Sequence, residues 1–224
     1  MEKITHLNHS FLSRVVVLAA VSTVLFLWGC GGGGPGAPGS EGSEDTGVIL
    51  EASIVPLYND TNTNSVDVFR QICTPATESS PAVYEVFTDH QATVTFTARS
   101  LNPQSTFRLG DLTIEKYSVE FFPSQDSLGA PPIETDTRYA TTVIPAPTGV
   151  TSVKVEATVV LVDLTRKFRY LSDLENRLYT SHDGFLNNYT AVYTFEGKND
   201  FGDSFEVKAQ TDFQIGSFDY CTTQ

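Results

Sequence analysis

The chain has 224 residues, of which 40% are hydrophobic, 11% aromatic and 18% charged. This length is sufficient for one globular domain with a substantial core, or for two small ones. The formal charge of −13 disfavours nucleic acid and anionic membrane surfaces as long-range partners. With three Cys and four His, and with neither a C-x-x-C-H nor a paired C-x-x-C motif, the sequence predicts no haem or zinc site.

The amino terminus has the features of a secretory signal. Lys3 and Arg14 make a weakly basic start, and an unbroken apolar or small stretch runs from Val15 to Trp28. Fourteen helical residues would span about 21 Å, which is short of the roughly 30 Å hydrocarbon core of a bilayer. The stretch therefore predicts a signal peptide at residues 1–29 rather than a membrane span.

The sequence Leu27-Trp28-Gly29-Cys30 closes this stretch and resembles the lipobox of bacterial lipoproteins. The resemblance implies cleavage before Cys30 and two or three acyl chains, such as palmitate, on its amino-terminal residue. Two chains already anchor a protein stably, and Gly31 after the Cys implies delivery to the outer membrane. Cleavage would also remove Trp28, the only Trp in the chain.

Residues 30–47 comprise the acylated Cys and a segment of Gly, Pro, Ala, Ser and acidic residues without apolar periodicity. Such a composition predicts a flexible spacer, with a reach of roughly 20–25 Å for a random coil of this length. The folded body is then expected to span residues 48–224 as one domain, because no second linker follows.

Alternation of apolar and polar residues predicts strands throughout this body. In His90–Ser100, Ala92, Val94 and Phe96 alternate with Thr. The same pattern predicts strands at Ser152–Val162, Asn188–Glu196 and Ser204–Ile215, and more weakly at Val48–Leu57, Ser65–Cys73, Ala82–Phe87 and Tyr139–Ile144. Turn residues between Gly197 and Gly202 predict a hairpin that joins two of these strands.

Two segments depart from simple alternation. Thr113–Phe122 changes phase, which predicts a strand with a bulge near Lys116–Ser118. Leu164–Leu178 has Leu and Phe at helical spacing, which predicts one short helix near 164–178, capped by Asp163 or Thr165.

Short strands, abundant Thr, Tyr and Phe, and punctuation by Pro and Gly predict an all-β fold, an antiparallel β-sandwich. The strand Tyr189–Phe195, the Gly197–Gly202 turn and the closing strand through Ile215 resemble the immunoglobulin-like or fibronectin-like modules of bacterial envelope proteins. The resemblance implies an immunoglobulin-like sandwich, elaborated because the body is longer than a standard module.

Cys73 and Cys221 remain once Cys30 is acylated. In the oxidising environment outside the inner membrane, such a pair is more often a structural disulfide than two free thiols. Closing a loop of this length would stabilise the fold by roughly 5 kcal/mol in the chain-entropy model.

Three groups of residues are candidates for function. Asp60, Asn62, Asn64 and Asp67 have the alternating oxygen ligands of a calcium loop, although Ser65 and Gln71 stand where Gly and Glu are expected. The alternative is a polar turn. Exposed Tyr side chains could also stack on a glycan.

The second group, Arg166, Lys167, Arg169 and Arg177, lies on the predicted helix and could dock an acidic partner or an anionic glycan. The alternative is a salt-bridged helix face in which Asp173 pairs with Arg169 and Arg177.

The third group comprises Ser181-His182-Asp183 and the pair Asp89-His90, which would be needed for a hydrolase. Adjacent residues cannot converge on one substrate atom, and there is no nucleophile elbow, so we expect no enzyme. The sequence favours a membrane-anchored envelope lipoprotein that acts as a non-catalytic interaction, adhesion or scaffolding module with an envelope protein partner. The alternative is a glycan- or calcium-binding envelope module.

Overall fold

The computed structural model describes residues 39–41, 44–106, 108–179 and 186–221. The predicted signal peptide, Cys30 and the Ser181-His182-Asp183 segment lie outside these residues. The described residues all belong to one compact unit, Pro35–Gln224. None of its described helices is long and apolar enough to cross a bilayer.

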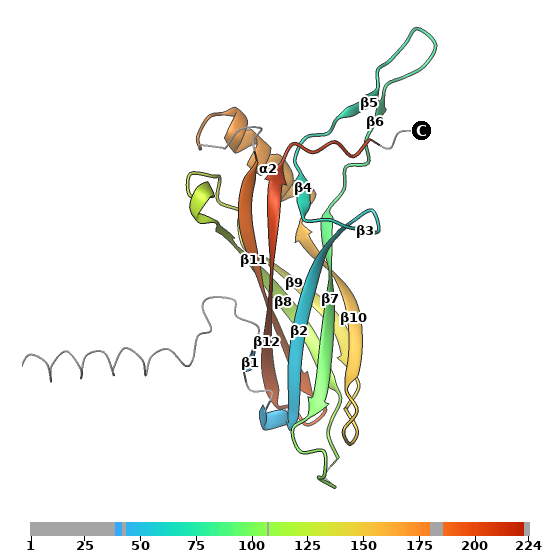
Figure 1. Ribbon diagram of the computed structural model, residues 1–224, viewed down its shortest axis with the longest axis vertical. Coiled ribbons are helices and arrows are strands. Elements are labelled where there is room, and N and C mark those ends of the chain that lie inside the picture. Colours follow the sequence, from blue (N-terminus) through green and yellow to red (C-terminus); the bar gives the residue numbers. More distant parts are fainter. Residues whose placement is uncertain (1–38, 42–43, 107, 180–185, 222–224) are drawn as a thin grey trace, which may run out of the picture. The chain divides into compact units, whose positions relative to one another are not determined.

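Two packed β-sheets form the body, which confirms the all-β sandwich (Figure 1). The first sheet has the order β1 (Gly39–Glu41), β12 (Ser204–Gly216), β11 (Asn187–Asn199), β8 (Leu112–Pro123) and β9 (Asp136–Ile144). The second has the order β10 (Val153–Val162), β7 (His90–Ser100), β2 (Val48–Tyr58) and β3 (Thr61–Asn62). A separate two-stranded sheet pairs β5 (Ile72–Thr74) with β6 (Val83–Tyr84).

The alternation seen in the sequence reflects burial between the two large sheets. Val94 and Phe96 on β7 are buried, and the Phe96 ring contacts Phe195 on β11 with a centroid distance of 5.0 Å. The predicted hairpin is also present, because β11 and β12 pair antiparallel from Asn187 to Lys198. Strand β2, only weakly indicated by the sequence, lies in the interior of its sheet beside β7.

The segment Ser65–Cys73 is not one strand, as predicted, but two short ones. Strand β4 (Ser65–Asp67) pairs with β12, and β5 belongs to the separate two-stranded sheet. The β4–β12 pairing is parallel, the one exception to antiparallel pairing among the described strands. Val66 and Val68 are buried in the core and Phe69 packs against it, whereas Arg70 is exposed where the chain leaves the sandwich.

The predicted bulge in β8 is present, but it lies earlier than expected. The register with β9 shifts between Ile114 and Lys116, which places the bulge at Glu115. The extra residue allows both Ile114 and Tyr117 to face the core. Opposite the bulge, Gly197 approaches the backbone so closely that a Cβ there would lie 2.1 Å from the Thr113 carbonyl oxygen.

Helix α2 (Leu164–Glu175) connects β10 to β11. The Asp163 side chain caps it by accepting a hydrogen bond from the Arg166 backbone N–H at 2.8 Å, as one of the two predicted caps. The buried side chains of the helix are Lys167, Tyr170 and Leu174. Phe168, which the spacing placed on the apolar face, is 55% exposed.

The predicted spacer contributes to the fold. Gly39–Glu41 forms β1 along the edge of β12, and Glu44–Thr46 forms a short 3-10 helix before β2. Strand β1 thus starts nine residues before Val48, within the predicted spacer, because the edge of β12 offers unpaired backbone groups to this segment.

Candidate functional site

Two buried carboxylates hold the carboxy-terminal segment against the body. Asp67 at the end of β4 accepts a hydrogen bond from the Phe218 backbone N–H at 2.9 Å. Glu85, just after β6, accepts from the backbone N–H groups of Gln71 at 2.8 Å and Tyr220 at 3.0 Å. The carboxylates thus accept backbone N–H groups of the carboxy-terminal segment, which belongs to none of the described strands.

A disulfide between Cys73 and Cys221 reinforces the same attachment, with a Cα–Cα distance of 5.3 Å. This confirms the bridge expected from the sequence. The Tyr220 hydroxyl donates to the Ser65 carbonyl, and its ring lies 4.8 Å from that of Tyr58. We call Asp67, Glu85, Tyr220 and the Cys73–Cys221 bridge the C-terminal clasp.

The clasp carries a titratable group near neutral pH. Burial raises the pKa of Asp67 to about 7, and Glu85 adds to this rise, although the N–H groups of Phe218 and Phe69 oppose it. The Asp67 Oδ2 atom has no hydrogen-bond partner among the described atoms. A proton on Asp67 therefore relieves its repulsion with Glu85.

Lys167 and His90 both contact the ring of Tyr58, which also packs against Tyr220 of the clasp. The Lys167 Nζ donates to the Thr88 carbonyl at 2.7 Å and lies 5.1 Å from the centroid of the Tyr58 ring. Burial lowers the pKa of Lys167 to about 8, although Asp67, Asp89 and Glu85 oppose the shift.

His90 is fully buried and stacks on Tyr58, with a ring-centroid distance of 5.3 Å. Its Nε2 lies 3.0 Å from the Thr63 carbonyl oxygen. Burial lowers the pKa of His90 to about 4, so the ring is neutral and donates through Nε2. This nitrogen is therefore engaged with the backbone. Asp89, which precedes His90 in the chain, accepts a hydrogen bond from the Leu164 N–H at 2.8 Å. His182, the other histidine considered for hydrolysis, lies outside the described residues.

The four residues predicted as calcium ligands do not form one loop. Asp60 lies in the turn between β2 and β3, Asn62 on β3 and Asn64 just after it, and all three are exposed. Asp67 is buried and belongs to the clasp. The chain turns Asp67 inward, away from the exposed turn, so Asp67 differs from the other three candidates in its surroundings.

The clasp contains another group of potential metal ligands, formed by Glu85, Asp219 and Cys221. The Cys221 sulfur is already bonded to Cys73, and both Glu85 oxygens accept backbone N–H groups. Asp219 itself accepts from the Cys221 N–H at 2.9 Å. These donors are engaged in holding the chain.

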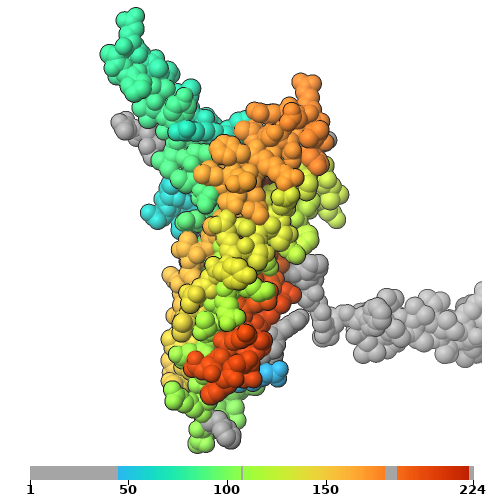
Figure 2. Space-filling model, turned by 180° about the vertical axis from the view of Figure 1, so that it is seen from behind, coloured from blue at the N-terminus to red at the C-terminus, as the bar shows by residue number. Residues whose placement is uncertain are grey.

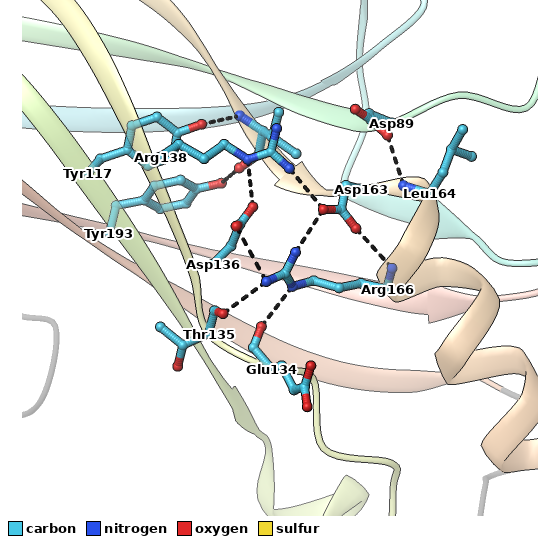
Figure 3. A network of polar contacts seen from close by, with 11 residues as sticks. Asp89, Tyr117, Glu134, Thr135, Asp136, Arg138, Asp163, Leu164, Arg166 and Tyr193 are labelled. Carbon is cyan, nitrogen blue, oxygen red and sulfur yellow. Dashed lines mark hydrogen bonds and ion pairs between the residues drawn. The ribbon is translucent and has the colours of Figure 1, made fainter.

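At the start of α2, where the sequence predicts a basic patch, the structure has a half-buried ionic network (Figure 3). The Arg166 guanidinium lies 2.7 Å from Asp163 and 3.3 Å from Asp136, and it donates to the carbonyls of Glu134 and Thr135. Arg138 on β9 bridges the same two carboxylates, at 2.6 Å to Asp136 and 2.8 Å to Asp163. The network joins the helix to the edge strand β9.

The remaining basic residues also depart from the expected patch. Lys167 is fully buried, so it cannot contribute to a docking surface, and Arg169 pairs with Glu134. Arg177 is exposed in a left-handed conformation just beyond the helix, with φ of 54°. A salt-bridged helix is thus the better description, but its acidic partners are Glu134, Asp136 and the capping Asp163 rather than Asp173.

A pair of tyrosines that the sequence analysis did not single out connects the two sheets. The Tyr193 hydroxyl donates to the Val160 carbonyl at 3.0 Å, and the Val160 N–H donates to the Tyr117 hydroxyl at 3.1 Å. The two hydroxyls thus bond the backbone N–H and carbonyl groups of Val160, next to the register shift of β10 between Val160 and Val162. The available signal was the presence of Tyr at inward-facing strand positions, since a buried Tyr hydroxyl needs a partner.

Strands β5 and β6 form a hairpin that projects from one end of the sandwich (Figures 1 and 2). We call residues 70–86 the arm. Four of its apolar side chains are exposed: Ile72 by 54%, Val83 by 52%, Tyr84 by 46% and Val86 by 58%. The Arg70 guanidinium lies 4.6 Å from the centroid of the Tyr84 ring, and the clasp holds the arm where it leaves the body.

Comparison with known proteins yields no functional assignment. No family model and no curated protein matches the sequence. A solved structure, the "X-ray structure of Northeast Structural Genomics Consortium target SoR45", aligns with 80% of this chain and 92% of that chain. The identity is 9% and the TM-score 0.31. At this similarity, function must be argued from the chain's own residues.

Proposed function

We propose that this protein is a lipid-anchored protein of the cell envelope, held in the outer membrane through Cys30, whose sandwich is a non-catalytic module for contact with another envelope protein. The sequence Leu27-Trp28-Gly29-Cys30 supports the anchor. The observation that carries the contact function is the arm, a clamped hairpin with four exposed apolar side chains.

An arm of this kind is suited to binding because it is apolar and already ordered. Single exposed apolar residues are common, but several on one projecting element are typical of an interaction site. The Cys73–Cys221 bridge and the Glu85 carboxylate fix both strands of the hairpin where they join the body. Less conformational entropy is then lost when a partner binds.

The described titratable residues support a non-catalytic role. The carboxylates of Asp67 and Glu85 accept backbone N–H groups, and Lys167 donates to a backbone carbonyl. His90 faces the Thr63 carbonyl rather than solvent. These groups stabilise the attachment of the arm and of the carboxy terminus.

The anchor is tested by Cys30→Ser in the full chain, expressed in its native host. We expect loss of acyl labelling and release from the membrane fraction, because the thiol that accepts the lipid is gone. Ser13→Ala in the signal peptide is the matched control and should leave both unchanged. Retention of the Cys30→Ser protein in the membrane would contradict the anchor.

The contact function is tested by cross-linking in intact cells. Val83→Ser combined with Tyr84→Ser should abolish the cross-linked product of the wild-type protein, because both side chains lie on the exposed arm. Val55→Ser, on β2, is the control, since Val55 is also exposed, by 46%, but lies off the arm. If the product forms equally well with all three proteins, the arm is not the contact surface.

A further inference from the structure

We infer that the end of the sandwich opposite the arm rests on the surface of the bilayer in which Cys30 is anchored, and that this surface is zwitterionic phospholipid. The inference rests on the proposed anchor. We call this end the loop end; it comprises the β7–β8 connection, the β9–β10 connection and the β11–β12 turn. In Figure 1 these connections lie together, at the end away from β5 and β6.

Each of the three connections presents an exposed apolar side chain. Leu101 is 48% exposed, Val150 is 85% exposed and Phe201 is 64% exposed. The three connections surround one open pocket of about 510 Å³, lined by Leu101, Gly149 and Asp200 among others. Apolar side chains at the tips of converging loops are placed to enter the interface between lipid headgroups and acyl chains.

The length of the tether brings this end to the membrane. Strand β1 pairs Gly39 with Lys208, four residues from the start of β12 at Ser204. At about 3.3 Å per residue, Gly39 therefore lies about 13 Å along the strand from the loop end. From Lys208 to the other end of β12 at Gly216 is twice that distance, about 26 Å.

Only residues 31–38 separate Cys30 from β1. A Gly-rich chain of eight residues has an r.m.s. reach of about 16 Å, and fully extended it spans at most about 29 Å. The r.m.s. reach exceeds the 13 Å to the loop end and falls short of the 26 Å to the other end of β12, so the loop end is the one that the tether favours at the bilayer surface. This leaves the arm accessible to a partner in the surrounding compartment.

The charges of the pocket determine which lipid surface fits. Asp111 and Asp200 line it together with Arg108, which is exposed and has no charged partner in the part of the chain that the structure describes. A guanidinium binds phosphate, and carboxylates attract an ammonium group. A headgroup such as that of phosphatidylethanolamine carries both charges, whereas an anionic surface would be repelled by the acidic protein.

The mature protein offers a clean optical test, because processing removes its only Trp. Phe201→Trp at the loop end and Tyr84→Trp on the arm each introduce a single fluorophore into the full chain. Both proteins are produced in the native host, purified with their acyl chains and reconstituted into phosphatidylethanolamine–phosphatidylcholine vesicles with brominated acyl chains. Flotation of the vesicles reports the anchor, and Trp emission reports the contact.

We expect both variants to float with the vesicles. The Phe201→Trp protein should show blue-shifted emission that is quenched by the brominated lipid, and the Tyr84→Trp protein should instead be quenched by acrylamide in the water. Equal quenching of the two floating proteins would overturn the loop-end contact and leave the anchor intact. Failure to float would overturn the anchor and this inference with it. Equally strong lipid quenching in phosphatidylglycerol vesicles would overturn the preference for a zwitterionic surface.

Discussion

Around the Tyr58 ring, the side chains of His90 and Lys167 are packed in contact with an aromatic face, close to the carboxylates of the clasp. Burial drives His90 and Lys167 towards their neutral forms and Asp67 towards its protonated form. The fold therefore favours the uncharged state of each group, which has consequences for stability that depend on pH.

Asp67 and His90 act on stability in opposite directions. The pKa of Asp67 rises from 3.8 to about 7 on folding, so its contribution is present below about pH 4 and is lost as the pH rises to about 7. The pKa of His90 falls from 6.5 to about 4, so its contribution is present above pH 6.5 and is lost as the pH falls towards 4. Between about pH 4 and pH 6.5, the two contributions therefore change the free energy of unfolding in opposite directions.

Asp67→Asn should remove the pH dependence of stability that comes from Asp67 and leave the one that comes from His90, because the amide resembles the protonated carboxyl and does not titrate. The free energy of unfolding should then rise between pH 4 and 6.5 by up to about 1.4 kcal/mol per pH unit, more steeply than in the wild type. Urea unfolding at several pH values checks this, with the exposed Glu120→Gln as control. A profile of Asp67→Asn parallel to that of the wild type would contradict the assignment.

Lys167→Met tests whether this buried amine stabilises the fold. The Met side chain preserves the volume but removes the donor to the Thr88 carbonyl and the positive charge near Asp67 and Glu85. We expect destabilisation by about 3 kcal/mol. Lys154→Met, at an exposed position of β10, should change the free energy of unfolding by less than about 0.5 kcal/mol. Similar effects of both substitutions would show that the buried amine contributes nothing specific.

At the scale of elements, the structure depends on how α2 is joined to the edge strand β9. The single carboxylate of Asp163 caps the helix and also contacts Arg138 and Arg166. Arg166 in turn binds the carbonyls before β9, so the helix cannot shift without breaking contacts on both elements.

The two functions of Asp163 can be separated by substitution. Asp163→Asn retains an oxygen that can cap the helix but loses the charge, with an expected destabilisation of about 2 kcal/mol. Asp163→Ala loses the cap as well and should cost about 1 kcal/mol more. The control is Asp173→Ala, which the structure predicts to be near neutral because the Arg169 side chain pairs with Glu134 instead. Urea unfolding measures the stability of all three variants. Equal losses of stability in Asp163→Asn and Asp163→Ala would show that the cap contributes nothing.

For the molecule as a whole, the disulfide connects segments that are 148 residues apart and joins the arm, the sandwich and the carboxy terminus. Replacing Cys73 and Cys221 together by Ser should lower the free energy of unfolding by up to about 5 kcal/mol, because the unfolded chain gains the entropy of an open loop. Hydrogen exchange should also become faster in residues 216–221, which the bridge tethers. Unchanged unfolding and exchange would mean that the carboxylates of the clasp hold the segment alone.

The elements that could be predicted are those whose pattern is local. Strand β7 has the predicted bounds, and the β11–β12 hairpin follows from alternation and from a turn rich in Gly, Asn and Asp. The helix was recognisable from its spacing, but its buried face was not. Lys167 is buried because its amine meets a carbonyl from a distant strand connection, which no local pattern records.

The sequence by itself determined which segments alternate, where the chain must turn, and which two cysteines could pair. Alternation and turn preference depend on neighbouring residues, and the candidate cysteine pair follows from the number of cysteines. Only the tertiary structure decided the roles of Asp67, His90 and the basic residues of α2. Whether a charged side chain is a ligand, a surface charge or a buried support depends on the backbone groups that distant segments bring to it. The same folding placed the arm and the three exposed apolar tips at opposite ends of the body.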